Sequence, residues 1–258
     1  MNISKRLPLA LMVAALGVSA AHAEPKMPPA QKKQIEQVVH DYLVSNPEVL
    51  IEASQALQKK QQETMQTQAR TAIAEHGSAL VSGSLTVAGN PKGDVTLVEF
   101  FDYQCVHCIK MKPVIDALIK KNPNLRVVYK EFPIFGKESE LASRVAIVAA
   151  KQGKYMAFQD AIFKSGQQHL DEEKVMAIAK KVGLNMETLK ADMNTPEVTK
   201  LLGESRSLAE SIHLMGTPAF VILATPNGKY KAGGEVSFLP GAADEADMQV
   251  LINKSAKK

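Results

Sequence analysis

Two cysteines are the residues of this chain whose type and spacing point most directly to chemistry. Cys105 and Cys108 are the only cysteines, and Val106 and His107 separate them. An apolar run at 95–101 precedes the pair, and apolar residues with helical spacing follow it. The pair therefore lies where a buried strand turns into a helix, a position typical of a dithiol that exchanges with disulfides.

The expected helix start explains why such a dithiol would be reactive. The first turn of a helix has backbone N–H groups without partners, and the aligned peptide dipoles place partial positive charge there. A thiolate is stabilised at that end, and only the thiolate attacks a disulfide. We therefore expect Cys105, at the exposed tip, to be the nucleophile, and Cys108 to be buried and to resolve the mixed disulfide. A partly charged imidazole at His107 would favour the thiolate further and make the disulfide more oxidising.

Two other uses of a cysteine pair fit the sequence less well. A zinc site needs two more soft or imidazole ligands, and the remaining histidines show no ligand spacing: His22, His40, His76, His169 and His213. A structural disulfide across so short a loop removes little entropy from the unfolded chain. The sequence therefore predicts a redox site with no metal and no cofactor other than the dithiol itself.

Glu99 is an acid inside the apolar strand that leads to the cysteines. Alternation along a strand places it on the same face as Val95, Leu97 and Phe101. A buried carboxyl beside a thiol pair could carry protons during disulfide exchange. An acid near a strand end that reaches solvent fits the residues equally well, so both interpretations stay open.

The first residues have the pattern of a secretory signal peptide, predicted at 1–23. Lys5 and Arg6 precede an apolar stretch at 7–18, and a small-x-small cleavage pattern ends at Ala23. An uncleaved membrane anchor is the alternative. Removing the segment takes away two cations and no acid, so the net charge of +4 falls to +2, which gives no electrostatic case for binding nucleic acid. Secretion also implies an oxidising compartment, where disulfide chemistry belongs.

Residues 24–76 form a predicted helical segment that is too small for a core of its own. Apolar residues follow helical spacing from Ile35 to Leu43, and Asn46-Pro47-Glu48 is a second helix start. The segment could fold back onto the main domain, or it could pair with a second copy of itself. Glycines and serines at 77–84 predict a linker.

The remaining chain, 85–258, alternates strands and helices in an order that predicts an α/β domain. Strands are expected at 85–88, 95–101, 125–132 and 219–223, with a hairpin turn at 226–228 and a partner strand at 229–231. Helical patterns fill about 136–213, and a last helix is expected at 244–254.

This order, together with the motifs Glu-Phe-Phe-Asp-Tyr-x-Cys-x-x-Cys and Gly-Thr-Pro-x-Phe-Val, resembles the DsbA-like branch of the thioredoxin superfamily. The resemblance implies a thioredoxin fold with an inserted α-helical domain at about 136–213. The N-terminal helices, with Asn-Pro-Glu-Val-Leu at 46–50, resemble those of dimeric, DsbA-like Com-type outer-membrane proteins. That likeness favours a homodimer formed through residues 30–76.

The resemblance also implies roles for individual residues. Cys105 would be the nucleophile and Cys108 the resolving thiol, while Pro218 would be a cis-proline facing the pair. The backbone at Thr217 would pair with an extended substrate segment, and Glu99 matches a buried acid of the family. The Val-His dipeptide between the cysteines departs from the Pro-His of strongly oxidising members, which leaves the direction of net electron flow open.

The sequence therefore predicts a periplasmic thiol–disulfide oxidoreductase that forms or isomerises disulfides in secreted proteins, with some association with the outer membrane possible. It would need a membrane redox partner, either a quinone-linked oxidase or a reductase. The alternatives are a dedicated isomerase or reductase that is kept reduced, and a non-catalytic chaperone or surface interaction protein.

Overall fold

A computed structural model of the chain describes residues 27–83, 86–166 and 170–256, and the predicted signal peptide lies outside these ranges. The helices and strands are α1 (Pro29–Ser45), α2 (Glu48–Val81), β1 (Val87–Gly89), β2 (Val95–Phe101), α3 (Val106–Lys121), β3 (Leu125–Glu131), α4 (Lys137–Lys151), α5 (Tyr155–Lys164), α6 (Glu172–Lys181), α7 (Met186–Asp192), α8 (Pro196–Ser211), β4 (Ala219–Ala224), the 3₁₀ turn η1 (Pro226–Gly228), β5 (Val236–Pro240) and α9 (Glu245–Ala256). None of the helices in the described ranges is long and apolar enough to cross a membrane.

The chain divides into two units after residue 58. The first holds α1 and the start of α2, and no residue of α1 is buried. Asn46 ends α1, because its side-chain Nδ2 donates to the carbonyl oxygen of Tyr42 at 2.9 Å. Large apolar side chains are exposed throughout this unit: Ile35, Val38, Val39, Tyr42, Val44, Leu50, Ile51 and Leu57. The apolar stripe expected from the sequence is therefore present and uncovered in the single chain.

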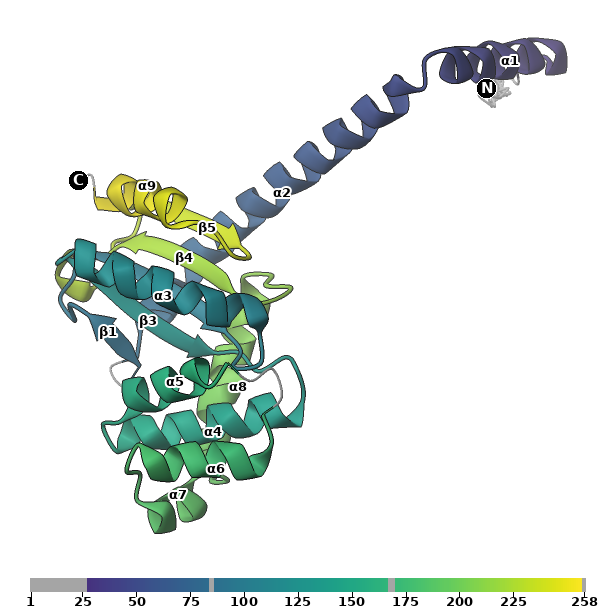
Figure 1. Cartoon of the computed structure of the whole chain (residues 1–258). Helices are drawn as coiled ribbons and strands as arrows, with labels where there is room; N and C mark the ends of the chain where they lie inside the picture. The colour runs from purple at the N-terminus through teal and green to yellow at the C-terminus, as the bar shows by residue number, and fades with distance from the viewer. Residues whose placement is uncertain (1–26, 84–85, 167–169, 257–258) are drawn as a thin grey trace, which may run out of the picture. The chain divides into compact units, whose positions relative to one another are not determined.

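The second unit, from residue 59 onward, is built on a five-stranded sheet in the order β1-β3-β2-β4-β5 (Figure 1). Strands β2 and β3 run parallel, while the other neighbouring pairs are antiparallel. Every residue of β2 is buried, because helices cover both faces of the sheet, as near-continuous apolar strands predict.

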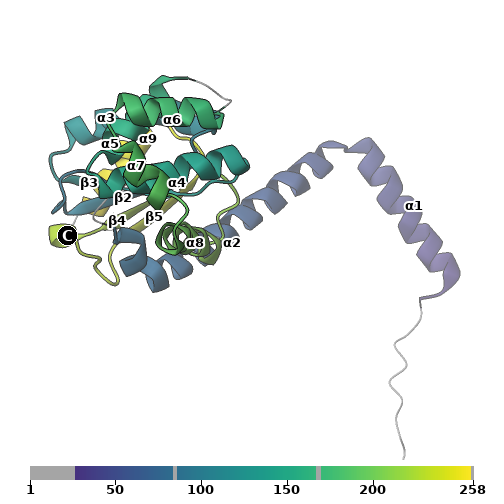
Figure 2. The same cartoon turned by 90° about the horizontal axis from the view of Figure 1, so that it is seen from below.

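Each face of the sheet carries its own hydrophobic core. The first core joins Leu97, Phe101 and Tyr129 to α3, α9 and the helical insertion. The second core joins Val98 and Phe100 to the end of α2 and to α8. Helices α4 to α7 stack on one another beside the sheet, and the turned view keeps them together (Figures 1 and 2). The insertion expected at about 136–213 is confirmed as α4–α8.

The predicted linker at 77–84 is wrong for residues 77–81, which continue α2 as helix, and residue 84 lies outside the described ranges. Gly77 is present here for close packing. A Cβ at this position would lie 2.3 Å from the ring of Tyr230, whose hydroxyl donates to the carbonyl of Ala74 at 3.2 Å. Of the two alternatives for residues 24–76, folding back onto the main domain is therefore correct for the last turns of α2, where Ala69 and Ile73 are buried.

Two cations of β3 bind the C-terminal end of α2. The Arg126 guanidinium donates to the carbonyl oxygen of Val81 at 2.8 Å, and the Lys130 ammonium donates to that of Ser82 at 2.9 Å. The last carbonyls of a helix have no intrahelical partners and carry partial negative charge, so cations stabilise this end.

The strand expected at 229–231 is also wrong, because the partner of β4 begins later, at Val236. Residues 229–231 contain Tyr230, whose ring is engaged by α2 instead. Val236 and Phe238 supply the alternating apolar residues that pack against the second core.

Candidate active site

The cysteine pair begins α3 at the end of β2. Cys105 is the N-cap of this helix, with extended backbone dihedrals of φ −74° and ψ 113°. Its Sγ accepts a hydrogen bond from the backbone N–H of Cys108 at 3.4 Å. The sulfur thus takes the place that a Ser or Asp oxygen occupies in an ordinary N-cap, which places it against the positive end of the helix.

Asp102 fixes the loop between β2 and the cysteines. Its carboxylate is fully buried and accepts hydrogen bonds from the N–H of Gln104 at 2.7 Å, the hydroxyl of Ser139 at 2.7 Å, and the N–H groups of Ile134 at 2.7 Å and Phe135 at 3.1 Å. The side chain of Gln104 donates back to the Ser139 hydroxyl at 2.9 Å. Sequence reasoning missed both loop residues, although two polar residues between a buried strand and a helix were a usable signal.

The sulfur of Cys105 lies against the loop before β4. Its S–H donates to the carbonyl oxygen of Thr217 at 3.2 Å, and the Thr217–Pro218 peptide bond is cis, the conformation that the resemblance implied. Cys105 is only 4% exposed, so the expectation that it lies at an exposed tip is wrong. The covering Thr217–Pro218 loop is distant in sequence and could not be inferred from the local pattern.

The two thiols differ strongly in acidity. Hydrogen bonding from the Cys108 side chain, together with the N–H groups of Cys108 and His107, lowers the pKa of Cys105 to about 5 against the opposing effect of burial. Burial, the hydrogen bond to Cys105 and the charge of Glu99 raise the pKa of the Cys108 thiol far above its ordinary value. At neutral pH, Cys105 is therefore the thiolate and Cys108 the thiol.

His107 contributes to this difference through its backbone. Its N–H is among the groups that lower the pKa of Cys105, while the residue itself is exposed. These N–H groups add to the larger effect of the Cys108 side chain, and a contribution of the His107 imidazole stays a prediction.

Glu99 lies in the middle of the sheet, opposite Tyr129 of β3 and Phe220 of β4. It is 1% exposed, so the alternative of an acid that reaches solvent is wrong. Burial raises the pKa of Glu99 to about 8, with Lys112 opposing the rise. The side chain can therefore exchange a proton near neutral pH, and the role of proton carrier remains a proposal.

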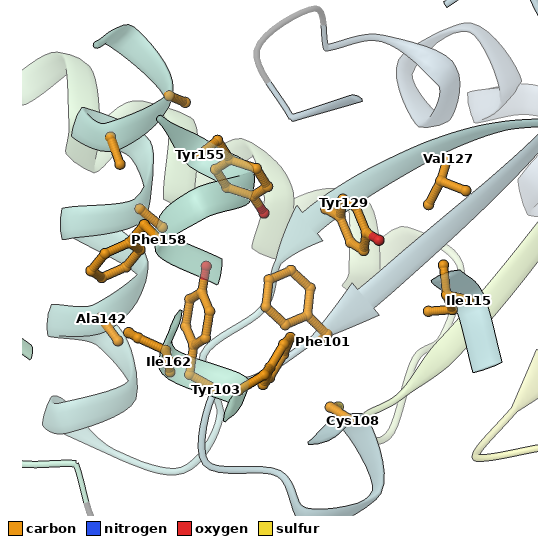
Figure 3. Close-up of a cluster of buried hydrophobic side chains, with 14 of the residues drawn as sticks. Phe101, Tyr103, Cys108, Ile115, Val127, Tyr129, Ala142, Tyr155, Phe158 and Ile162 are labelled. Atoms are coloured by element: carbon orange, nitrogen blue, oxygen red, sulfur yellow. The ribbon is translucent and has the colours of Figure 1, made fainter. Parts of the chain in front are cut away.

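A second buried acid, Glu131, went unnoticed in the sequence. The hydroxyls of Tyr103 and Tyr155 donate to its Oε1 at 3.1 and 2.8 Å, and burial raises the pKa of Glu131 to about 8. Figure 3 shows these tyrosines converging beside Phe101 and Tyr129. The cluster ties the loop before Cys105 to α5 of the helical insertion.

The six site residues predicted from the sequence lie on β2, at the start of α3 and in the loop before β4. Cys105, Cys108 and Thr217 are linked by the contacts above, and Pro218 follows in the same loop. Glu99 acts on both thiols by charge. Among the described residues, no group of three or more His, Cys, Asp or Glu side chains is arranged to hold a metal ion.

One protein-family profile matches most of the second unit. A family profile described as a DSBA-like thioredoxin domain matches residues 96–253. The chain belongs to the DsbA-like thioredoxin family. By class it is a thiol:disulfide oxidoreductase. A further profile, the N-terminal domain of the copper resistance protein ScsC, matches residues 31–63 of this DsbA-like protein.

Individual relatives agree with this assignment. The thiol:disulfide interchange protein DsbA of Burkholderia cepacia is 27% identical over 166 residues, which are 62% of this chain and 76% of that protein. The BcfH structure from Salmonella enterica Typhimurium is 31% identical, with a TM-score of 0.75 over 88% of this chain and 96% of that one. A thioredoxin-like oxidoreductase from Silicibacter pomeroyi DSS-3 is 37% identical, with a TM-score of 0.62 over 70% of this chain and 98% of that one.

The acidity of Cys105 gives a direct prediction for the reduced DsbA-like protein. We expect its rate of alkylation by iodoacetamide to rise with pH around a midpoint of about 5, because only the thiolate reacts. The Cys108→Ser variant should be alkylated once, at Cys105, which mass spectrometry of the digested chain would show. A midpoint near the ordinary cysteine pKa of about 8.5 would contradict the assignment of Cys105 as nucleophile.

Proposed function

We propose that this protein exchanges disulfides with secreted client proteins in the periplasm through Cys105 and Cys108. The observation that supports this most strongly is the contrast between the two thiols: the pKa of Cys105 is lowered to about 5, while that of buried Cys108 is raised. A low-pKa thiolate is a good leaving group, so the disulfide form gives up its bond readily.

Oxidation of a client would proceed in two exchanges. A client thiolate attacks the Cys105 sulfur, the Cys105–Cys108 bond breaks, and Cys108 leaves and takes a proton. The second client thiolate then attacks the client sulfur of the mixed disulfide, and Cys105 leaves as a stable thiolate. The client dithiol loses two electrons and the protein gains them, and Glu99, with its pKa near 8, would supply or accept the proton at Cys108.

Client segments would bind along the Thr217–Pro218 loop, where an extended segment could add to the backbone as a strand. Exposed apolar residues belong to the segments that form the site: Val106 follows Cys105, and Met215 lies two residues before Thr217. Ile134 and Phe135 are exposed as well. Ile134 and Phe135 are held by Asp102 of the cysteine loop. An apolar rim favours clients that have not finished folding, because they still expose apolar residues.

The direction of exchange defines the partners. An oxidase would be reoxidised by a quinone-linked membrane protein, while an isomerase would be kept reduced by a membrane reductase. Because the Cys105 thiolate is a good leaving group, its acidity favours a protein that donates its disulfide to the client. Isomerisation stays the second candidate, because the Val-His dipeptide departs from the strongly oxidising type and Thr217 before the cis-proline resembles the dimeric isomerases more than DsbA. A fraction of the molecules could associate with the outer membrane.

We also propose that the protein self-associates through residues 30–76, with a homodimer as the simplest assembly. The exposed apolar residues of α1 and the start of α2 support this, because a contiguous apolar stripe left in water marks a surface that a partner covers. Two linked catalytic units could enclose a misfolded client, which suits isomerisation.

Refolding of a scrambled multi-disulfide protein tests these proposals together. We expect the mature chain, residues 24–258, to be an oligomer that restores activity to the scrambled substrate. A variant with Val38 and Tyr42 changed to Asn should be monomeric and should oxidise reduced substrate at an unchanged rate, while its repair of scrambled substrate falls severalfold. Light scattering would give the mass, and Lys33→Asn with Gln34→Asn is the matched control.

Three outcomes would change the proposals. A monomeric mature chain would exclude self-association, and a mass of three chains would retain self-association but replace the dimer. If neither oxidation nor repair exceeds the rate without protein, the periplasmic exchange function fails.

A further inference from the structure

Lys112 is a buried lysine that the exchange steps above do not use. It lies on α3 one turn after Cys108, which places the two side chains on the same face of the helix. Only 8% of the residue is exposed. A charged side chain is seldom buried to this extent unless it is paired, so the position of Lys112 requires an explanation.

Two carboxylates pair with this lysine. The Lys112 Nζ lies 2.6 Å from Oδ1 of Asp116, one turn further along α3, and 2.8 Å from Oδ1 of Asp160 on α5. The Lys112 side chain is 9% exposed, while those of Asp116 and Asp160 are 42% and 38% exposed. The cluster of Lys112, Asp116 and Asp160 therefore has a buried end, the lysine, which we call the inner end, and two carboxylates that water reaches.

Glu99 shares a face of β2 with Leu97 and Phe101, and this is the face that α3 covers, so the inner end of the cluster acts on Glu99 by charge. The charged and titratable groups that act on Glu99 are Lys112, Cys105 and Asp116 from α3 and its cap, and Glu131 from β3. Glu99 acts in turn on Cys108 and on Tyr129. Lys112 is the cation in this set, and it opposes the burial that favours the protonated form of Glu99.

Lys112 also keeps its charge in this setting. Burial alone would lower the pKa of Lys112, but the hydrogen bonds and charges of Asp116 and Asp160 outweigh it and hold the pKa above its ordinary value. The carboxylate from α5 thus connects the helical insertion to the electrostatics of the cysteine pair.

We propose that Lys112, held between Asp116 and Asp160, is a positioning residue for the resolving step: its ammonium favours the charged form of Glu99, so that Glu99 can take the proton from Cys108. The inference rests on the proposed exchange function. The proposal places the two cysteines and the charge that controls proton transfer on the same helix, α3.

The resolving step in question closes the protein disulfide. In the mixed disulfide, Cys105 is bonded to a substrate sulfur. The Cys108 thiol gives its proton to the Glu99 carboxylate, and the resulting thiolate attacks the Cys105 sulfur. The Cys105–Cys108 bond forms, the substrate leaves as a thiolate, and its disulfide has been reduced by the two electrons that the dithiol has lost. Glu99 then returns the proton to water.

The aromatic disulfide dithiobis(nitrobenzoate) separates this step from the first attack. Reduced protein releases one coloured thiolate when Cys105 attacks and a second when Cys108 resolves the mixed disulfide, and both phases can be followed in a stopped-flow instrument as a function of pH. Lys112→Met should move the midpoint of the second phase to higher pH by about one unit, which slows it roughly tenfold at neutral pH. The first phase serves as an internal control.

Asp116→Asn provides a test of sign. Asp116 raises the pKa of Glu99, so its removal should move the second phase to lower pH, opposite to Lys112→Met. A merely structural defect has no reason to shift the two profiles in opposite directions. Lys112→Arg should restore the wild-type profile because it keeps the charge, and Lys110→Met on the exposed side of α3 should leave both phases unchanged.

Each result decides between the proposals. Opposite shifts with rescue by arginine support the assignment. An unchanged second phase in Lys112→Met, or a shift of the same sign in Asp116→Asn, overturns the role of Lys112 and leaves the exchange function intact. If Lys112→Met does not fold, Lys112→Gln, which also removes the charge but keeps a polar end, takes its place in the comparison with Asp116→Asn. If wild-type protein shows no first phase, the exchange function itself fails.

Discussion

Replacement of Cys105 by serine will reduce disulfide formation and disulfide repair to the rates measured without protein. Cys105 is the thiol whose pKa lies near 5, so it supplies the thiolate, while Cys108 is fully buried and its pKa is raised. Serine keeps the size of the side chain but is not ionised at neutral pH. The measurement is the refolding assay described above, with both a reduced and a scrambled substrate.

Cys108→Ser is the matched variant, and it should fail differently. The first attack by Cys105 stays possible, but the mixed disulfide cannot be resolved within the protein. A covalent complex with the client should therefore accumulate and should be visible on a non-reducing gel, and it should be absent from Cys105→Ser. Full repair activity in Cys105→Ser would refute the redox function, and suppression of client aggregation by both variants would instead favour the chaperone alternative.

Ile73→Ala will destabilise the catalytic unit by about 2–5 kcal/mol. Ile73 lies in α2, yet it is fully buried in the core that α2 and α8 form with Val98 and Phe100 of β2. Removing its outer atoms leaves a cavity that the packed sheet fills only in part. Urea unfolding followed by the near-ultraviolet circular dichroism of the buried tyrosines reports this unit, because the chain has no tryptophan.

Ile51→Ala is the control for this prediction, since it makes the same change in the same helix. Ile51 is 61% exposed in the single chain and belongs to the first unit, so its substitution should change the stability of the catalytic unit by no more than about 0.5 kcal/mol. Equal effects of the two substitutions on the unfolding midpoint of the catalytic unit would contradict the structural role assigned to the end of α2.

The parts of the fold that were predictable from the sequence are those set by local patterns. The apolar run of β2, the cysteines at the start of α3 and the helix start after Asn46 all depend on residues within a few positions of one another. Gly77 shows the limit of such patterns. Its neighbours suggest a linker, but the ring that requires a glycine there belongs to Tyr230, more than a hundred residues later.

The same limit applies to the site. Cys105 and Cys108 were found because their spacing is local. The burial of Glu99 could not be decided, because the helices that cover its face come later in the chain. The role of Lys112 has no local signal beyond an ordinary i,i+4 pair with Asp116, because its second partner, Asp160, lies on α5.

The bonds from Arg126 and Lys130 to the end of α2 determine where the chain can be cut. The DSBA-like match begins at residue 96, yet a protein trimmed to that point would lose Ile73 and Leu80 from its core. It would also leave two cations of β3 without their carbonyl acceptors. A truncation that keeps both this core and these acceptors therefore has to begin before Ala69, well ahead of residue 96, where the family match begins.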